Sequence, residues 1–274
     1  MATNKANPED LLAAIYASRK DDDDDDDDEF SEDEELGSSS MTLIEHLEEL
    51  RWRIFKSLIA IAVGAIVAFI FRGQIVYFLQ LPLPKTADTL THGKPIVTGI
   101  TEGFTVFLMI SIAAGFILAL PVVLYQAWAF ISPGLYPKEK KYAVPFILVG
   151  IILFAAGISL GYIVLQYPVQ WLVTFASDSF AELVTAGSYF TFVAFFMLAF
   201  GLVFEIPLVL TFLAQVDLIS SQTLVKKRAA SHVGMWIAST FLTPGADIYS
   251  PLFLGVSMSC LYELTIIFMK ITKK

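Results

Sequence analysis

The chain has 274 residues, of which 56% are hydrophobic and 16% charged, and its formal net charge is −9. A soluble domain of this length could not bury so much apolar surface, so the composition excludes an ordinary soluble protein and indicates a membrane protein. The acidity is local, because residues 1–40 hold 15 of the 27 acids and 3 of the 18 bases. The remainder holds 15 bases and 12 acids, a balance of +3.

Residues 1–40 are predicted to form a disordered acidic tail. The run DDDDDDDDE at 21–29 repels itself and cannot bury a core. A solvated tail and a calcium-chelating or docking segment both remain open for it. No apolar stretch precedes a small-residue cleavage site, so we expect no cleavable signal peptide.

Residues 41–274 are predicted to form one all-α membrane domain. Thr42 and Glu45 match a capping box, which indicates a helix that lies on the membrane surface and runs into the first span. Apolar runs predict six membrane helices, at 54–71, 105–130, 142–165, 188–215, 232–243 and 248–271. The fifth covers only about 18 Å, against a hydrocarbon core of about 30 Å. The polar stretch TPGAD at 243–247 ends it.

Basic residues predict that both termini are cytoplasmic. A six-span arrangement places twelve bases on one side, and only Arg72, Lys85 and Lys94 on the other. The partly apolar segments 73–104 and 166–187 are predicted to form short interfacial helices on the outside. The twelve inner bases are Arg51, Arg53, Lys56, Lys138, Lys140, Lys141, Lys226, Lys227, Arg228, Lys270, Lys273 and Lys274.

The sequence favours neither an enzyme nor a cofactor site. It has no phosphate-binding loop and no dinucleotide fingerprint. The three histidines lie far apart and the single Cys260 has no ligand partner, so no metal site or internal disulfide is predicted. Membrane topology accounts for the basic clusters, so no nucleic-acid partner is expected.

Two acids stand among the bases of the predicted cytoplasmic face. Glu49 lies in HLEELRWR, and it can either pair with Arg53 one turn on or bind a ligand. Glu139 lies in SPGLYPKEKKY. It can either bind a ligand or, together with Pro137, stabilise the N-terminus of the next helix. Close together, the two carboxylates would form a site for a cation, since a carboxylate can hold a guanidinium through two hydrogen bonds.

A third acid, Glu205, lies within the fourth predicted span in LVFEIPLVL. It is about 15 Å from the cytoplasmic end of that span, near mid-bilayer. Pro207 cannot donate a backbone hydrogen bond to Val203, so a kink is predicted there. A polar notch at this depth is expected to face protein or water.

Four segments, in order, resemble the TatC family, the multi-spanning receptor subunit of the twin-arginine protein translocase. They are HLEELRWRI, LPVVLYQAWAFISPGLYPKEKKYAVP, FEIPLVL and KKRAASHVGMWIASTFLTP. The resemblance implies six helices in a curved, glove-like arrangement in the bacterial cytoplasmic (inner) membrane. It implies binding of twin-arginine signal peptides and an oligomeric complex with the single-span TatA and TatB proteins. It also implies export of folded proteins driven by the proton-motive force, without nucleotide.

The same resemblance assigns candidate residues. It implies signal-peptide binding at Glu49 and Glu139, with Phe130, Leu135 and Arg51 in the same two segments. Glu205, beside Pro207, matches the family's intramembrane acid. We hypothesise that Glu205 faces a wet concave side and accommodates polar parts of an inserted peptide or partner helix. The alternative is a neutral acid that is hydrogen-bonded within the bundle and serves packing only.

The segment TPGADIYSP at 243–251 departs from the family pattern. Many members carry a Pro-Pro-Asp step followed by a glutamine, whereas here Asp247 comes one residue later and Pro251 stands at the glutamine position. Partner-helix docking beside the short fifth helix is therefore predicted at Thr240 and Thr243, with Met235 on the same helix.

Two other classes of protein fit part of the pattern. A secondary transporter could use Glu205 as its proton or ion site, although no inverted repeat or glycine-broken helix pair is visible. A structural scaffold without substrate specificity is the second. Neither class predicts a preference for paired arginines over paired lysines.

Overall fold

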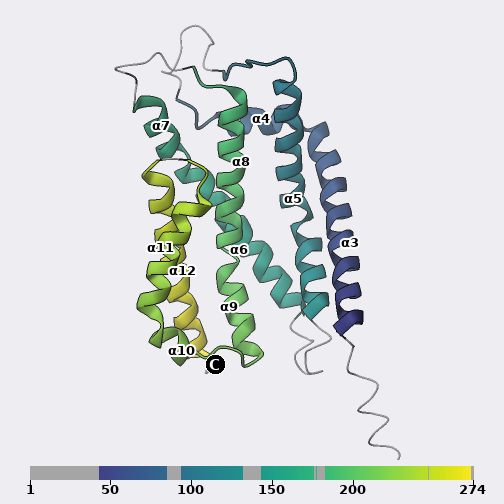
Figure 1. The fold of residues 1–274 in the computed structure, drawn as a ribbon, viewed down its shortest axis with the longest axis vertical. Helices are drawn as coiled ribbons and strands as arrows, with labels where there is room; N and C mark the ends of the chain where they lie inside the picture. The colour runs from purple at the N-terminus through teal and green to yellow at the C-terminus, as the bar shows by residue number, and fades with distance from the viewer. Residues whose placement is uncertain are drawn as a thin grey trace, which may run out of the picture. The chain divides into compact units, whose positions relative to one another are not determined.

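The computed structural model describes residues 43–84, 94–131, 143–175, 177, 183–245 and 247–272. The chain divides into two compact units, residues 1–51 and 52–274. Within the described ranges the regular structure is helical, with one isolated parallel bridge between Ile96 and Thr185 (Figure 1). The predicted acidic tail lies outside the described residues.

Five of the six predicted spans are confirmed as helical segments long and apolar enough to cross a membrane. In the described part of the chain these segments are Ile44–Ile70, Glu102–Ile131, Ala143–Thr174, Ala186–Gln215 and Tyr249–Ile271. They correspond to helices α3 (Leu43–Ile70), α5 (Glu102–Ile131), α6 (Ala143–Val164) with α7 (Gln166–Thr174), α8 (Ala186–Val203) with α9 (Ile206–Gln215), and α12 (Tyr249–Ile271).

The fifth predicted membrane helix corresponds to α11 (Arg228–Leu242), which has 15 residues and is too short to join that set. The sequence correctly indicated a short helix here but placed its start at His232, four residues late. At 1.5 Å per residue α11 covers about 22 Å, which is still less than the hydrocarbon thickness of about 30 Å.

Besides α7, two more short helices lie between the long ones in the described residues. α4 (Arg72–Gln80) and α7 confirm that short helices occur in both predicted outer segments. α10 (Ser221–Lys226) was not predicted, although its start is typical of a capped helix. The Ser220 hydroxyl accepts a hydrogen bond from the Thr223 N–H at 3.2 Å.

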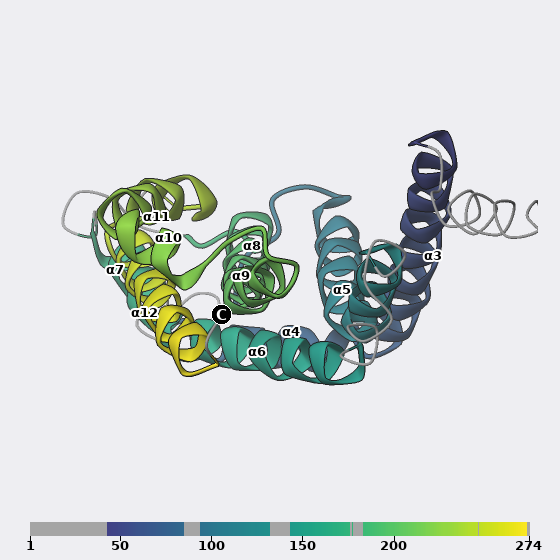
Figure 2. The same cartoon turned by 90° about the horizontal axis from the view of Figure 1, so that it is seen from below.

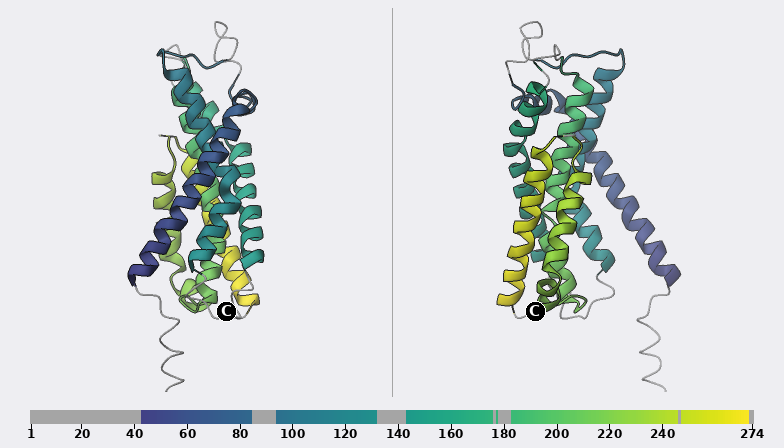
Figure 3. Two further views of the ribbon diagram at one scale, coloured as in Figure 1. Left: turned by 90° about the vertical axis from the view of Figure 1, so that its right-hand side faces the viewer. Right: turned by 60° about the vertical axis from the view of Figure 1, so that its left-hand side comes forward.

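The core of residues 52–274 is built around α8. Phe196 and Phe200 of α8 are fully buried, and Phe154 of α6 is buried with them. α8 packs most extensively against α6 and α5, and Figure 2 shows α8 and α9 between α5 and the α11–α12 pair, with α6 running along one side of them. α11 and α12 form a second close pair and lie side by side in Figure 3.

From Trp52 onward α3 approaches α5 closely at a crossing of small residues. A Cβ atom on Gly64 would lie 2.6 Å from the Gly115 carbonyl oxygen, and one on Gly115 would lie 2.4 Å from the Ala65 nitrogen. Such backbone-to-backbone approach is how membrane helices pack where water-driven burial is absent. Elsewhere this part of α3 exposes large apolar side chains, such as Val63 and Ile66.

At the end where α8 begins, side chains tie the short segments to the bundle. Glu102 at the start of α5 accepts hydrogen bonds from the N–H of Thr98 at 2.6 Å and of Gly187 at 2.8 Å. The hydroxyls of Tyr162 and Tyr189 donate to backbone carbonyls of α4 at 2.9 Å and 2.6 Å. The helix order and spacing at this end are therefore fixed by polar contacts as well as by packing.

Candidate functional site

The predicted signal-peptide site is only partly described. Glu49 lies in the first turns of α3, within residues 1–51, where its carboxylate is 3.9 Å from Nδ1 of His46. The Glu49 side chain is partly exposed, and Arg51 is exposed two residues further on. The acidic and the basic residues of HLEELRWRI therefore all lie on α3.

The other predicted members of this site come from the segment between α5 and α6. Phe130 is partly buried in the last turn of α5. Leu135 and Glu139 lie outside the described residues. The joint site of Glu49 and Glu139 thus stays a prediction.

Glu205 lies at a break in a membrane helix. α8 ends at Val203 and α9 begins at Ile206, so the helix is interrupted between Val203 and Pro207, the two residues whose backbone hydrogen bond proline cannot make. This interruption lies where the kink was predicted. α9 itself ends in a Schellman-type turn, in which Leu218 N–H donates to the Leu213 carbonyl at 3.0 Å and Asp217 adopts φ 56°.

The Glu205 carboxyl group is enclosed by neighbouring helices. Both oxygens are buried, and among the described residues neither has a protein hydrogen-bond partner. A Cβ atom on Gly150 of α6 would lie 3.3 Å from Oε2, and 2.7 Å from Cδ1 of Leu124 on α5. The carboxyl group therefore lies against the backbone of α6. The described residues supply no hydrogen bond of the kind that the packing-only alternative needs, and the wet face stays a prediction.

The three residues predicted for partner docking lie on or next to α11, but they do not share one exposed face. Met235 is 9% exposed and Thr243 is 8% exposed, so both are buried within the chain itself. The Thr243 hydroxyl donates to the Ser239 carbonyl at 3.0 Å. Only Thr240 is exposed, and the docking prediction is narrowed to its surroundings.

The altered segment after α11 has a local structural role. The buried Asp247 accepts hydrogen bonds from the N–H and the hydroxyl of Ser250, both at 2.6 Å. Asp247 lies one residue before the N-cap Ile248, and its carboxylate satisfies a free N–H group in the first turn of α12 and favours the positive end of the helix dipole. Asp247 therefore holds the start of α12.

A polar cluster that the sequence analysis missed joins α11 to α12. The Glu263 carboxylate accepts a hydrogen bond from Arg228 and lies 2.9 Å from Nε2 of His232. The other ring nitrogen of His232 lies 3.1 Å from the Ser259 hydroxyl. Arg228 and His232 are one turn apart on α11, as are Ser259 and Glu263 on α12. These two four-residue spacings are the signal that could have revealed the cluster.

Comparisons with known proteins give one consistent answer. Residues 45–256 match the family model described as Sec-independent protein translocase protein (TatC). The chain is 40% identical over 235 residues to a protein of that name from Carboxydothermus hydrogenoformans, which covers 85% of this chain and 94% of the relative. It is 38% identical over 224 residues to one from Desulforapulum autotrophicum, with 81% and 82% covered.

A solved structure is similar along most of the chain. The crystal structure of a twin-arginine translocase receptor, TatC, superposes with a TM-score of 0.71 at 32% sequence identity. The match covers 84% of this chain and 100% of that one.

Proposed function

The chain belongs to the TatC family of Sec-independent protein translocase proteins, and on that premise we propose that it is the membrane receptor for twin-arginine signal peptides. The family match carries the proposal, because it spans both segments that hold the acids Glu49 and Glu139. As a member of that family the chain is a multi-pass component of a protein translocase. What we propose beyond the family membership is the specificity for twin-arginine peptides, the partner proteins and the orientation in the membrane.

Recognition in this proposal rests on two carboxylates. Glu49 is partly exposed and stands beside the bases Arg51 and Arg53. Acids add little to topology, so an acid in a basic segment at the membrane surface calls for another role. A carboxylate holds a planar guanidinium through two parallel hydrogen bonds, which an ammonium group cannot match. Two carboxylates would accordingly select two consecutive arginines, with Phe130 and Leu135 contacting the neighbouring peptide residues.

The orientation follows the basic residues. With twelve bases on one face, both termini and the loop between α9 and α11 are placed in the cytoplasm of a bacterium, and the chain lies in its inner membrane. α11 counts as a sixth, short membrane helix, beside which the bilayer thins at a cost of fractions of a kcal/mol per Å. The exposed face of α11 around Thr240 is where a single-span TatA or TatB helix docks. The resulting complex exports folded proteins with the proton-motive force.

The recognition step is tested by reversing each charge in turn. Glu49→Lys and Glu139→Lys should each weaken binding of a twin-arginine peptide at least about tenfold, because losing one partner of a partly desolvated charge pair costs roughly 2–5 kcal/mol. Glu139→Gln should be milder. Glu48→Lys is the matched control, since Glu48 is exposed on the same turn of α3. Unchanged crosslinking of the peptide to the Glu139→Lys protein would show that the assignment is wrong.

A further inference from the structure

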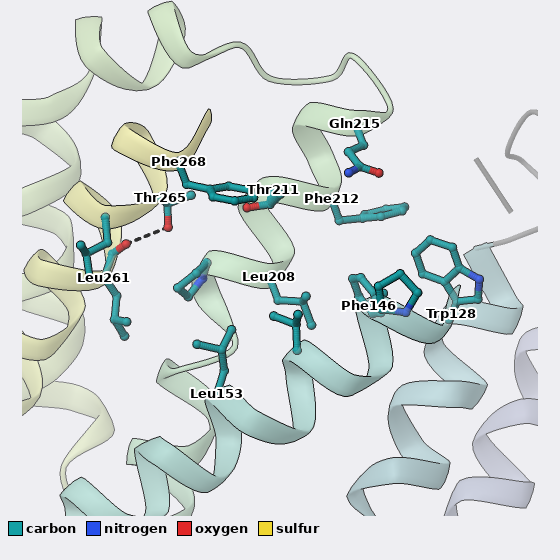
Figure 4. A pocket seen from close by; sticks show the side chains of 14 residues that line it. Trp128, Phe146, Leu153, Leu208, Thr211, Phe212, Gln215, Leu261, Thr265 and Phe268 are labelled. Carbon is teal, nitrogen blue, oxygen red and sulfur yellow. Dashed lines mark hydrogen bonds between the residues drawn. The ribbon is translucent and has the colours of Figure 1, made fainter. Parts of the chain in front are cut away.

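An apolar pocket lies between α6, α9 and α12, with a contribution from the end of α5 (Figure 4). Its volume is about 390 Å³. One wall is an aromatic trio: the Trp128 and Phe146 rings are 4.8 Å apart, and Phe212 lies edge-on to both. Leu264 and Phe268 of α12 form the opposite wall, and Leu153 lies at the inner end.

The pocket runs inward from the ends of the helices. Trp128 is in the last turns of α5, Phe146 is in the first turn of α6, and Gln215 is the last residue of α9. Leu153 lies ten residues after Ala143, the first residue of α6, which corresponds to a depth of about 15 Å. This is half of a hydrocarbon core of about 30 Å, so the pocket spans one leaflet.

The chemistry of the lining changes along this depth. Apart from Thr211, Thr265 and Gln215, the lining is formed by Leu, Val, Pro, Phe and Trp side chains, and the Thr265 hydroxyl is already bonded to the Leu261 carbonyl at 2.7 Å. Such a lining offers too few polar partners to hold ordered water. The Gln215 amide and the aromatic Trp128 lie at the mouth, where amphipathic side chains meet lipid headgroups.

The shape of the lining favours a thin linear occupant over a partner helix. A helix is about 10–12 Å wide and approaches another closely where small residues leave room. Among the described residues the lining contains no Gly, Ala or Ser, and bulky Phe, Leu and Trp side chains form its walls.

We propose that this pocket holds one acyl chain of a phospholipid. The phospholipid belongs to the leaflet in which the C-terminal ends of α9 and α12 lie. The chain tail packs between the aromatic trio and α12, and the headgroup stays at the mouth beside Gln215. The bound chain fills the space that the side chains of α6, α9 and α12 leave between them. This site is separate from the proposed site for paired arginines, because none of the residues assigned to arginine recognition lines it.

The test uses the full-length protein in vesicles of phosphatidylethanolamine and phosphatidylglycerol, with a trace of phospholipid that carries a diazirine at the end of one acyl chain. After illumination, labelled residues are mapped by mass spectrometry. Leu153→Trp places an indole in the inner end of the pocket. Ile152→Trp is the matched control, because Ile152 is the preceding residue, is 66% exposed and does not line the pocket.

We expect labelling to concentrate on pocket residues of α9 and α12, and to fall about tenfold in Leu153→Trp, a factor equivalent to about 1.4 kcal/mol. Ile152→Trp should leave it unchanged. Labelling spread evenly over the apolar surface, or equal in the two variants, would overturn the proposal. If Leu153→Trp does not fold, Thr211→Phe narrows the same pocket and carries the test.

A second measurement separates lipid from polypeptide. A photoreactive phenylalanine analogue at Leu264, on the pocket wall, should crosslink to phospholipid in cells. A crosslink from this analogue to a polypeptide would overturn the proposal and show that a polypeptide occupies the pocket. Loss of the lipid adduct on addition of a twin-arginine peptide would likewise show that the peptide occupies it. Peptide binding itself should be the same in Leu153→Trp and the unmodified chain, which keeps this outcome distinct from failure of the proposed function.

Discussion

Replacing Glu205 by leucine should make the protein more stable and less active. Both carboxyl oxygens are buried against α6, and within the described residues they have no protein hydrogen-bond partner. A buried polar group left without a partner costs about 1–3 kcal/mol, so removing it should raise the free energy of unfolding by that amount. Leucine is close to glutamate in size and leaves no large cavity. A group that lowers stability in this way points to a role other than packing.

The matched variant is Glu205→Gln, which keeps a polar group of the same shape. Its free energy of unfolding should stay within about 1 kcal/mol of the unmodified chain, because an amide at this position is equally short of partners. Unfolding is followed in mixed micelles by circular dichroism, and transport is followed in membrane vesicles. We expect near-normal transport with glutamine and impaired transport with leucine, while binding of a twin-arginine peptide is retained in both.

Two results would refute this reasoning. A leucine variant that is less stable than the unmodified chain would mean that the carboxyl group does hold a stabilising partner. A leucine variant that transports normally would mean that Glu205 has no part in the transport step.

Three further predictions follow from other contacts. Gly115→Ala should lower the free energy of unfolding by about 1–3 kcal/mol, because its Cβ atom would lie 2.4 Å from the Ala65 backbone nitrogen. The control Gly234→Ala should leave the free energy of unfolding unchanged, because there is open space around Gly234, and equal effects of the two variants in micelles would contradict the close crossing. Glu263→Ala should lower the melting temperature, because Arg228 and His232 lose the carboxylate that they share. Glu263→Gln should lower the melting temperature less, and an unchanged melting temperature for Glu263→Ala would show that the cluster does not hold α11 to α12. A cysteine at the exposed Thr240 should crosslink to a TatA or TatB helix and one at the buried Met235 should not, and crosslinks from α3 alone would overturn the docking proposal.

The membrane helices could be predicted because hydropathy and length carry that information. The starts of α8 and α12 differ from their predicted positions by two residues and one residue. The interruption of the helix before Pro207 was also predictable, since a missing N–H acts locally. α10 was missed because it has only six residues, and the apolar-run criterion does not register so short a helix.

The faces of the helices could not be predicted in the same way. α5, α6 and α8 are apolar all round, so no periodic pattern marks the buried side. On α11, Met235 was predicted for docking together with Thr240, although only Thr240 is exposed. The enclosure of Glu205 depends on Gly150, 55 residues away in the chain, and the Glu263 cluster depends on two helices packing in register. Both are tertiary features that one helix's sequence does not contain.

The central claim, receptor function for paired arginines, is tested most directly by equilibrium binding. The purified full-length protein in lipid nanodiscs is titrated with a fluorescent signal peptide that carries Arg-Arg, and with the same peptide carrying Lys-Lys. The account predicts at least about tenfold tighter binding of the arginine peptide, because bidentate carboxylate contacts are lost with lysine. Equal affinities for the two peptides would contradict it, and would leave a transporter or a scaffold as the better description of this chain.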